Sequence, residues 1–249
     1  MKVLIAIDSC VEYANKGNNQ VLRETYLQDI GKFTGLEYRF FIGDGTKTEE
    51  DTAAFEKDFE SCPWELYKKK QTEQPAFTYA PRPDEIVLPV EDGYKHLAYK
   101  TREAQRWSVE HGFDYCFQCF PDTHIHLARL LSSGFEKHDY IGYNANDGWY
   151  AGGGPGYWLS KKASSLLLQE NIEVWFEDMW VGSVMKKHGI TFTLDQRYSN
   201  FERPNKDNNL ITCHLGHNEP GFEYSQEKMR EAYRLSKEEN KPLRFKRKL

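Results

Sequence analysis

Short apolar runs alternate with helix-like patterns through the first half of the chain. Residues 3–7 are all apolar and end at Asp8 and Ser9, which is typical of a buried parallel strand that leads into a polar loop. Similar runs predict three further strands, at residues 38–43, 84–88 and 115–120. Apolar positions at helical spacing predict helices at residues 18–31 and 94–111, and one through Leu127, Leu130 and Leu131.

The order of these elements predicts the fold class. Because strands and helices alternate, we expect a single α/β domain with a mixed, mostly parallel sheet flanked by helices, of the nucleotide-binding type. In such sheets ligands bind at the carboxyl ends of the strands. Asp8 and Ser9 would then lie near a nucleotide, and a helix cap is an equally good interpretation of the pair. The pattern weakens between residues 46 and 83, where prolines indicate an insertion or loop.

The stretch from Trp149 to Gly189 combines glycines, aromatic residues and paired acids. Three consecutive glycines, residues 152–154, allow a backbone that approaches a ligand closely. Ser160 predicts the start of an apolar helix, and Glu177 and Asp178 lie between aromatic residues. Such parts suit a carbohydrate site, where rings stack on sugars and a carboxylate takes a hydroxyl proton. A glycine loop packed on an aromatic core is the alternative interpretation.

Composition and charge narrow the function classes. The chain has 249 residues and a formal net charge of −5, which argues against a broad nucleic-acid-binding face. No apolar run approaches the roughly 20 residues that cross a bilayer, and the first ten residues do not read as a signal peptide. Five irregularly spaced cysteines do not suggest a disulfide framework. We therefore expect a cytoplasmic protein without a transmembrane segment.

Acidic and histidine residues after two predicted strands suggest a metal site. Asp122 and His124 lie two residues apart beyond the run at 115–120, so in an extended segment both side chains would face one ion. His214 ends a short apolar strand and is a third candidate. Carboxylate and imidazole together suit a divalent cation such as Mn²⁺. A surface aspartate beside a histidine is the alternative, and Cys213 with His214 and His217 also allows a zinc interpretation.

Five segments resemble one enzyme family, in its order and spacing. They are residues 21–26 (VLRETY), similar to an Arg-x-Thr-Trp element; residues 40–43 (FFIG), similar to a second strand; residues 84–107, similar to a "D-I-x…D-x-Y-x-N-L-x-x-K-T…W" run; residues 151–160 (AGGGPGYWLS), similar to "G-G-G-Y-x-L-S"; and residues 177–182 (EDMWVG), similar to "E-D-V-x-V-G". The chain thus resembles the GT-A β-1,3-glycosyltransferases, the group that contains the Fringe enzymes, the β-1,3-galactosyltransferases and the core 1 galactosyltransferases.

The resemblance implies a GT-A fold and an inverting, metal-dependent transfer of a hexose or N-acetylhexosamine from a UDP-sugar. The acceptor would be a hydroxyl of a glycan or glycoprotein. Asp122 matches the last aspartate of the family's Asp-x-Asp motif, and His214 matches its late metal-binding histidine. Phe120 and Pro121 stand where the family has earlier acidic residues. The implied metal ligands for Mn²⁺ or Mg²⁺ are therefore Asp122, His124 and His214.

The same resemblance assigns roles to further residues. Asp178 would be the general base that accepts the proton of the attacking hydroxyl. The residues expected at the nucleotide-sugar donor are Asp8, Arg23, Lys100, Asp122, Gly153 and Gly154. The residues expected at the acceptor are Trp149, Tyr150, Glu177 and Trp180.

These roles divide the domain into three parts. Residues 1–120 would form the nucleotide-sugar-binding half, and residues 121–225 the metal, acceptor and catalytic half. Residues 226–249 would form a C-terminal helix and a basic tail. Because the chain shows no membrane anchor, we expect a bacterial or viral enzyme that acts in the cytoplasm. The alternative is a catalytically inactive GT-A relative that acts as a carbohydrate-binding or scaffold protein.

Overall fold

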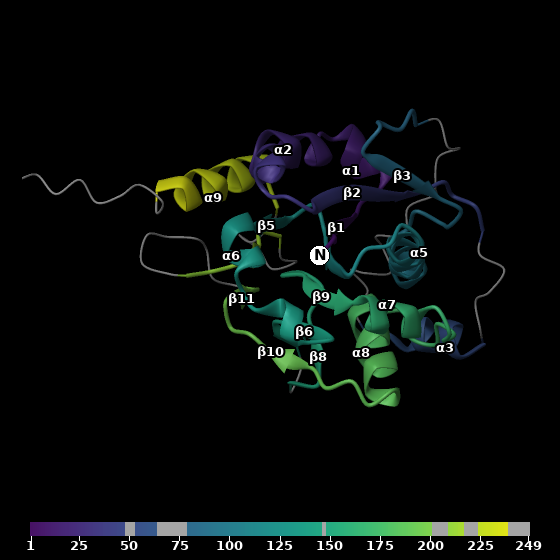
Figure 1. Ribbon diagram of the computed structural model, residues 1–249. Coiled ribbons are helices and arrows are strands. Elements are labelled where there is room, and N and C mark those ends of the chain that lie inside the picture. Colours follow the sequence, from purple (N-terminus) through teal and green to yellow (C-terminus); the bar gives the residue numbers. More distant parts are fainter. Residues whose placement is uncertain (48–52, 64–78, 146–147, 201–208, 217–223, 239–249) are drawn as a thin grey trace, which may run out of the picture.

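A seven-stranded sheet with the strand order β10-β6-β9-β4-β1-β2-β3 forms the centre of the molecule (Figure 1). The computed structural model describes residues 1–47, 53–63, 79–145, 148–200, 209–216 and 224–238. Strands β1 and β2 pair in parallel, as do β1 and β4, β2 and β3, and β6 and β10. Strand β9 alone runs antiparallel to its neighbours, β4 and β6. The expected mixed, mostly parallel sheet is confirmed.

The bounds of the elements follow the chain in order. The strands are β1 Val3–Asp8, β2 Leu36–Gly43, β3 Glu85–Leu88, β4 Tyr115–Cys119, β5 Thr123–Ile125, β6 Tyr140–Gly142, β7 Asn144–Ala145, β8 Tyr150–Ala151, β9 Tyr157–Ser160, β10 Thr193–Leu194, β11 Tyr198–Ser199 and β12 Thr212–His214. The α-helices are α1 Val11–Asn15, α2 Asn18–Glu24, α3 Ala53–Ser61, α5 Leu97–Glu110, α6 Leu127–Leu131, α7 Lys161–Leu167, α8 Glu177–Lys187 and α9 Gln226–Glu238. The 3₁₀ helices are η1 Tyr26–Lys32, η2 Tyr94–His96 and η3 Phe135–Lys137.

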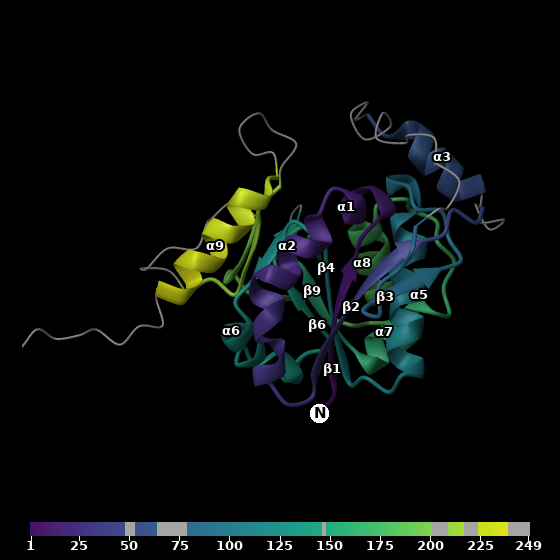
Figure 2. The ribbon, with the colours of Figure 1, turned by 90° about the horizontal axis from the view of Figure 1, so that it is seen from above.

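Helices cover both faces of the sheet, which gives two apolar layers. Figure 2 shows α5, α7 and α8 on one side and α2, α6 and α9 on the other. Tyr99, Leu167 and Val181 belong to the first apolar cluster, and Val21 and Met229 belong to the second. Strand β1 is buried along its whole length because it lies between the two layers. This explains why its sequence is continuously apolar rather than alternating.

The helix expected at residues 18–31 is divided into two pieces. Helix α2 ends at Glu24, and η1 follows as a tighter 3₁₀ helix from Tyr26. The Thr25 hydroxyl donates to the carbonyl oxygen of Val21 at 2.7 Å, and Thr25 leaves the helical region at φ −111° and ψ −120°. A threonine side chain that competes for backbone acceptors in this way interrupts a helix.

The cap expected at Ser160 is confirmed. The Ser160 hydroxyl accepts a hydrogen bond from the backbone N–H of Ala163 at 3.2 Å, and α7 begins at the next residue. This bond satisfies one of the N–H groups that the first turn of a helix leaves without a partner. Ser160 is also the last residue of β9, so it fixes the point at which strand becomes helix.

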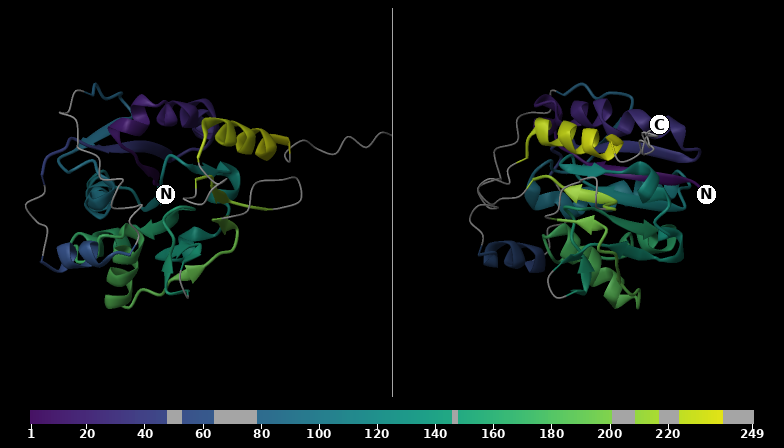
Figure 3. Two further views of the ribbon diagram at one scale, coloured as in Figure 1. Left: turned by 180° about the vertical axis from the view of Figure 1, so that it is seen from behind. Right: turned by 90° about the vertical axis from the view of Figure 1, so that its left-hand side faces the viewer.

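The helix expected near the C-terminus is present as α9, which packs against the N-terminal helix α2 (Figures 1 and 3). Gln226 donates to the carbonyl oxygen of Lys16 at 2.6 Å, and Tyr233 donates to Asp29 at 2.8 Å. Met229 is buried between the two helices and the sheet. Within the described ranges, no helix combines the length and apolar character that a membrane span requires. The basic residues 244–248 lie outside the described residues.

Candidate functional site

The strand order reverses between β1 and β4. From β1 the chain adds β2 and β3 on one side, and β4 lies on the other side. In open α/β sheets this reversal opens a crevice at the carboxyl ends of the two strands, where ligands bind. Asp8 ends β1 there, and the turn with Phe120 and Asp122 follows β4. The sequence-predicted position of Asp8 at a strand end is confirmed.

Asp8 is a buried carboxylate at this crevice. Its Oδ2 accepts a hydrogen bond from the Thr101 hydroxyl at 2.6 Å. Burial raises the pKa of Asp8 to about 6, and the Thr101 bond and the Lys100 charge offset only part of that effect. Asp8 therefore holds a proton or a negative charge depending on pH in the mildly acidic range.

The structure brings Asp122 and His214 together from distant parts of the chain. His214 ends β12, which pairs antiparallel with β5, and the backbone N–H of Leu215 donates to the Asp122 carbonyl oxygen at 2.8 Å. The His214 Nε2 atom lies 3.1 Å from Asp122 Oδ2. On the other side of the ring, His214 Nδ1 lies 2.9 Å from Asn200 Oδ1. Asn200 thus orients the imidazole toward the carboxylate, as second partners of metal-binding histidines do.

His124 does not join this pair, which corrects the three-residue ligand set expected from the sequence. Asp122 lies in a turn, so the alternation of an extended strand does not apply between it and His124. In the β5–β12 register His124 pairs with Cys213, whereas His214 pairs with Thr123, so the two imidazoles point to opposite faces of the small sheet. His124 is buried against the edge of the Tyr26 ring, and burial lowers its pKa to about 3.

The register also bears on the zinc interpretation. Cys213 faces the same side of the small sheet as His124 and is buried, so its thiol is directed away from the His214 ring. His217 lies outside the described residues. The two groups of the zinc interpretation that can be placed, Cys213 and His214, therefore do not converge.

The Asp122–His214 pair fits a divalent cation. Adjacent ligands of an octahedral ion with bonds of about 2.1 Å lie about 3.0 Å apart, close to the observed 3.1 Å. The second oxygen, Asp122 Oδ1, is buried without a hydrogen-bond partner in the described part of the chain. Among the same residues, no three His, Cys, Asp or Glu side chains form a metal-holding group. An ion held by this pair would therefore need further oxygens from a bound diphosphate or from water.

Two glycines make room for the pair. A Cβ atom at Gly154 would lie 2.5 Å from His214 Nδ1, and one at Gly216 would lie 2.6 Å from Asp122 Oδ2. Real Cβ atoms do not approach this closely, so any other residue at either position would displace the imidazole or the carboxylate. The glycines at 154 and 216 are thus part of the construction of the site.

The glycine loop is tied both to the small sheet and to helix α8. The Thr123 hydroxyl donates to the Gly154 carbonyl oxygen at 2.7 Å, and the Thr212 hydroxyl donates to that of Pro155 at 2.7 Å. At the other end of the loop, the Gly153 N–H donates to Asp178 Oδ2 at 3.1 Å. The loop therefore joins the Asp122–His214 pair to the first turn of α8, where Asp178 lies.

Glu177 and Asp178 are adjacent acids in different environments. Glu177 is buried and its Oε1 accepts a short hydrogen bond from the Tyr157 hydroxyl. Burial raises the pKa of Glu177 well above its ordinary value, and the charge of Asp178 adds to this effect. Asp178 keeps partial access to solvent, and the surrounding protein raises its pKa also. Environments of this kind favour a protonated Glu177 beside an Asp178 that can accept a proton.

Two residues expected at the donor, Arg23 and Lys100, form ion pairs with carboxylates of the chain. The Arg23 guanidinium binds Asp84 at 2.8 and 2.9 Å and Glu85 at 2.7 Å. Lys100 is 2% exposed, and its ammonium group donates to the Ser9 carbonyl oxygen at 2.5 Å and to Asp92 at 2.7 Å. Both charged groups thus already have carboxylate partners within the chain.

The expected acceptor residues divide in the same way. Tyr150 and Trp180 are only 3% and 2% exposed and belong to the core, and the Trp180 indole N–H donates to the Asn171 carbonyl oxygen at 3.1 Å. Trp149 is half-buried and packs against Tyr150 with ring centroids 4.5 Å apart. Of the three expected acceptor aromatics, Trp149 is therefore the one placed at the surface, where Lys186 lies 5.7 Å from its ring centroid.

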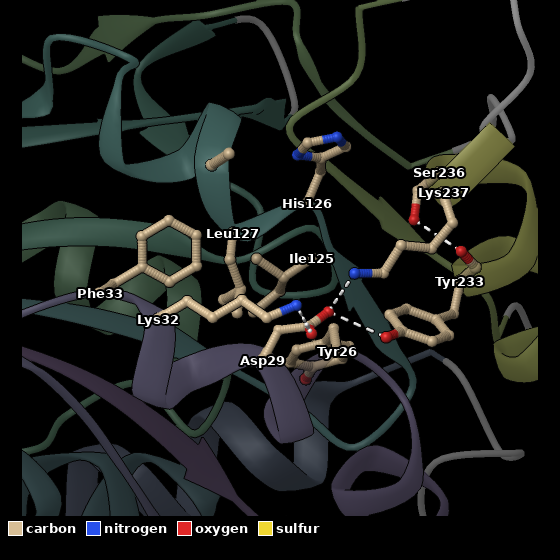
Figure 4. Close-up of a pocket in the computed structure, with 11 residues that line it drawn as sticks. Tyr26, Asp29, Lys32, Phe33, Ile125, His126, Leu127, Tyr233, Ser236 and Lys237 are labelled. Atoms are coloured by element: carbon tan, nitrogen blue, oxygen red, sulfur yellow. Dashed lines mark hydrogen bonds and ion pairs between the residues drawn. The ribbon is translucent and has the colours of Figure 1, made fainter. Parts of the chain in front are cut away.

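A small hollow of about 90 Å³ lies away from the strand ends, between η1, α6 and α9 (Figure 4). Asp29 points into it and binds Lys32 at 2.6 Å, Tyr233 at 2.8 Å and Lys237. Because these partners neutralise Asp29 and connect η1 to α9, the hollow belongs to the docking surface of the C-terminal helix.

Several residues at the strand ends carry no signal in the sequence. Asn200 and Gly216 meet the site only through the fold, and the tyrosines at 26 and 224 read as core or loop residues. Of these four residues, only Gly216 lies close to His214 in the sequence.

Comparison with known proteins gives no match: neither a protein-family model nor a curated protein matches the chain. The case for a function therefore rests on the residues at the strand ends.

Proposed function

We propose that this protein is an inverting glycosyltransferase of the GT-A type. It moves a hexose or N-acetylhexosamine from a UDP-sugar to a hydroxyl group of a glycan or glycoprotein. The observation that carries the proposal is the placement of Asp178: a partly exposed carboxylate with a raised pKa, held by the Gly153 N–H, and joined through the glycine loop to the Asp122–His214 pair.

The reaction needs one base and one binding site for a diphosphate. As the acceptor oxygen bonds to the anomeric carbon, the bond between that carbon and the UDP oxygen breaks, and Asp178 takes the hydroxyl proton. The Gly153 N–H orients the Asp178 carboxylate for this step. Glu177, which burial keeps protonated, stays neutral, so the pair carries a single charge.

Asp122 Oδ2 and His214 Nε2 would hold a divalent cation, Mn²⁺ or Mg²⁺, that offsets charge on the departing diphosphate. Asn200 keeps the imidazole oriented for this role. Gly153 and Gly154 would contact the sugar, as the resemblance implies. A side chain at either position would collide with Glu177 or His214 and displace it.

The fold supports the proposal. Ligands of open α/β sheets bind where the strand order reverses, and Asp8, Asp122, the glycine loop and Asp178 gather around that place. The resemblance of residues 151–160 and 177–182 to glycosyltransferase motifs falls on the same loop and the same helix start.

A carbohydrate-binding relative without catalysis is the second candidate. It is favoured by Phe120 and Pro121, which replace acidic residues of the family motif, and by the lack of a third His, Cys, Asp or Glu ligand near the pair in the described residues. Such a protein would bind sugars or nucleotides but would release no UDP.

A UDP-release assay over a panel of UDP-sugars and glycan acceptors, with and without Mn²⁺, tests the proposal. Asp178→Asn keeps the shape of the side chain and removes its basicity, so turnover should fall about 10²- to 10⁴-fold. The matched control is Asp139→Asn, because Asp139 is a partly exposed carboxylate bound to Ser160 and Lys162 at the opposite edge of the sheet. Its turnover should stay near that of the unmodified protein.

Two results would contradict the assignment. Near-normal turnover of a folded Asp178→Asn variant would exclude Asp178 as the base. Donor binding without UDP release from any sugar in the panel would favour the carbohydrate-binding alternative.

A further inference from the structure

Three buried polar atoms at and around Asp122 do not bond to one another. They are Asp122 Oδ1 and the hydroxyl oxygens of Tyr26 and Tyr224, and none has a hydrogen-bond partner among the described residues. They come from the turn after β4, from η1 and from the segment that leads into α9. Buried polar atoms nearly always have partners, so a cluster of three without one calls for an explanation.

The charge of Asp122 acts on both tyrosines, so the three groups lie in one region of the molecule. Burial raises the pKa of the Tyr26 and Tyr224 phenols, and the charge of Asp122 raises both further. Tyr224 also raises the pKa of Tyr26. Each phenol hydroxyl can donate one hydrogen bond.

The surrounding residues fix the two tyrosines. A Cβ atom at Gly216 would lie 2.6 Å from Asp122 Oδ2 and 3.1 Å from Tyr224 Cβ, so Asp122 and Tyr224 face each other across that glycine. The Tyr26 ring is held edge-on by His124, with centroids 5.8 Å apart. The phenols are thus placed by packing rather than by hydrogen bonds of their own.

The two hydroxyl donors and the carboxylate oxygen form no direct hydrogen bonds with one another. A water molecule between them could bind all three. A buried water makes about three hydrogen bonds to polar groups that otherwise lack partners. Through such a water the tyrosines would hold Oδ1 and leave Oδ2 directed at His214 Nε2, where it lies 3.1 Å away. Carboxylates that bind metals are themselves held by hydrogen bonds of this kind.

We propose that Tyr26 and Tyr224 are positioning residues for Asp122, whose carboxylate they orient toward His214 through a bridging water. The metal-binding consequence rests on the proposed function, in which Asp122 and His214 hold a divalent cation. Because Tyr224 lies two residues before the start of α9, the docking of this helix on α2 also sets the geometry of the site. The site is complete only when this last described helix is in place.

Variants that lack single hydroxyl groups test the proposal. Tyr26→Phe and Tyr224→Phe keep the rings and remove the donors, and Tyr233→Phe is the matched control in α9, because its hydroxyl binds Asp29 instead. Mn²⁺ binding in the presence of UDP is followed by the electron paramagnetic resonance signal of free Mn²⁺. Each of the first two variants should bind Mn²⁺ about tenfold more weakly, the usual effect of losing an outer partner of a metal ligand. Tyr233→Phe should bind it unchanged.

A second measurement does not depend on a metal. The shift in the thermal unfolding midpoint that Tyr224→Phe causes is measured twice, once in the unmodified protein and once in the Asp122→Asn variant. If Tyr224 holds Asp122, the substitution Tyr224→Phe should lower the midpoint of the unmodified protein. It should lower the midpoint of the Asp122→Asn variant by less, because the effects of substitutions at two interacting residues are not additive. Equal shifts in both backgrounds would overturn the proposal.

The two measurements separate the possible failures. Equal Mn²⁺ affinity of the unmodified protein and the Asp122→Asn variant would overturn the metal site of the proposed function. The comparison of unfolding midpoints would then decide the positioning role by itself. Weak Mn²⁺ binding by the Tyr233→Phe control, at the level of Tyr224→Phe, would show that loosening α9 is sufficient and would overturn the role of the Tyr224 hydroxyl.

Discussion

His124 shows how one buried imidazole couples stability to pH. Neither ring nitrogen has a hydrogen-bond partner among the described residues, and burial lowers its pKa to about 3. An unfolded histidine titrates near 6.5. The unfolded chain therefore binds this proton first as the pH falls, so the contribution of neutral His124 to stability is intact above pH 6.5 and is lost progressively toward pH 3.

Replacement of His124 by phenylalanine should remove this pH dependence. The ring packs against Tyr26 in either case, and phenylalanine has no group to protonate. Relative to the unmodified protein, the free energy of unfolding of His124→Phe should rise by about 2 kcal/mol between pH 7 and pH 5. Denaturant titrations at the two pH values measure this change, and any constant offset from packing cancels in the comparison. A difference that stays constant with pH would show that His124 is already charged or exposed.

Asp8 should have the opposite pH dependence. Its pKa of about 6 in the folded protein is above the unfolded value of about 3.9, so the folded state binds the proton more strongly. Burial of the Asp8 carboxylate therefore costs little stability near pH 4, where the group is protonated, and costs most above pH 6, where it is charged. The gain in unfolding free energy of Asp8→Asn over the unmodified protein should therefore increase by about 2 kcal/mol from pH 4 to pH 7. Urea titrations across this range would contradict the raised pKa if the gain did not change.

At the scale of elements, the glycine loop connects β8, β9, α8 and the small sheet. The Gly154→Ala variant places a methyl group 2.5 Å from His214 Nδ1, so the imidazole must move away from Asp122. We expect the folded variant to lose most of its divalent-cation binding, measured by calorimetric titration of Mn²⁺ with UDP present. Gly31→Ala is the control, because no atom lies within 4 Å of the added Cβ. Unchanged Mn²⁺ binding in Gly154→Ala would place the cation away from His214.

The sequence predicted elements better than it predicted partners. The apolar run 3–7, the Ser160 cap and the amphipathic helix near the C-terminus depend on local patterns, and the structure has all three. Arg23 and Trp180 were expected at ligands, yet the structure binds Arg23 to Asp84 and Glu85 and buries Trp180. A charged or aromatic residue looks the same in a sequence whether its partner is a ligand or another part of the chain.

Contacts that the fold creates between distant residues explain the remaining differences. The pairing of Asp122 with His214 was expected, whereas its support by Asn200 was not, because nothing in the local sequence of Asn200 indicates a functional role. His124 was misplaced because Asp122 lies in a turn and the strand begins only at Thr123, so Asp122 and His124 do not alternate along one strand. Such a turn depends on hydrogen bonds between Phe120 and Thr123 that periodicity does not reveal.

At the scale of the whole molecule, one buried ion pair holds several elements together. Lys100 in α5 binds Asp92, and Asp92 in turn accepts from the backbone N–H groups of Val11 at 2.7 Å and Gly43 at 2.9 Å. The same lysine binds the Ser9 carbonyl oxygen. This arrangement fixes the carboxyl ends of β1 and β2 relative to α5, and so fixes the wall of the crevice that contains Asp8.

Loss of Lys100 should therefore destabilise the protein as a whole. Lys100→Met leaves the Asp92 charge without its ammonium partner, and breaking a buried ion pair from one side typically costs about 3–5 kcal/mol. Chemical denaturation should show a cooperative transition at lower denaturant concentration. Lys16→Met is the control, since Lys16 forms an exposed pair with Glu12 and should change stability by less than about 1 kcal/mol. Equal effects of the two variants would show that the Lys100–Asp92 pair is not essential to the fold.

The contact between α9 and the N-terminal helices has a consequence for synthesis. Tyr233 and Asp29 are 204 positions apart, and Gln226 and Lys16 are 210 apart. At translation rates of about 5–20 residues per second, roughly 10–40 s pass between the synthesis of α2 and the synthesis of the segment that covers its outer surface. During that interval Val21, Leu22 and Tyr26 lack part of their cover. Chaperones that recognise apolar segments on nascent chains would therefore bind at α2, and the docking of α9 would release them.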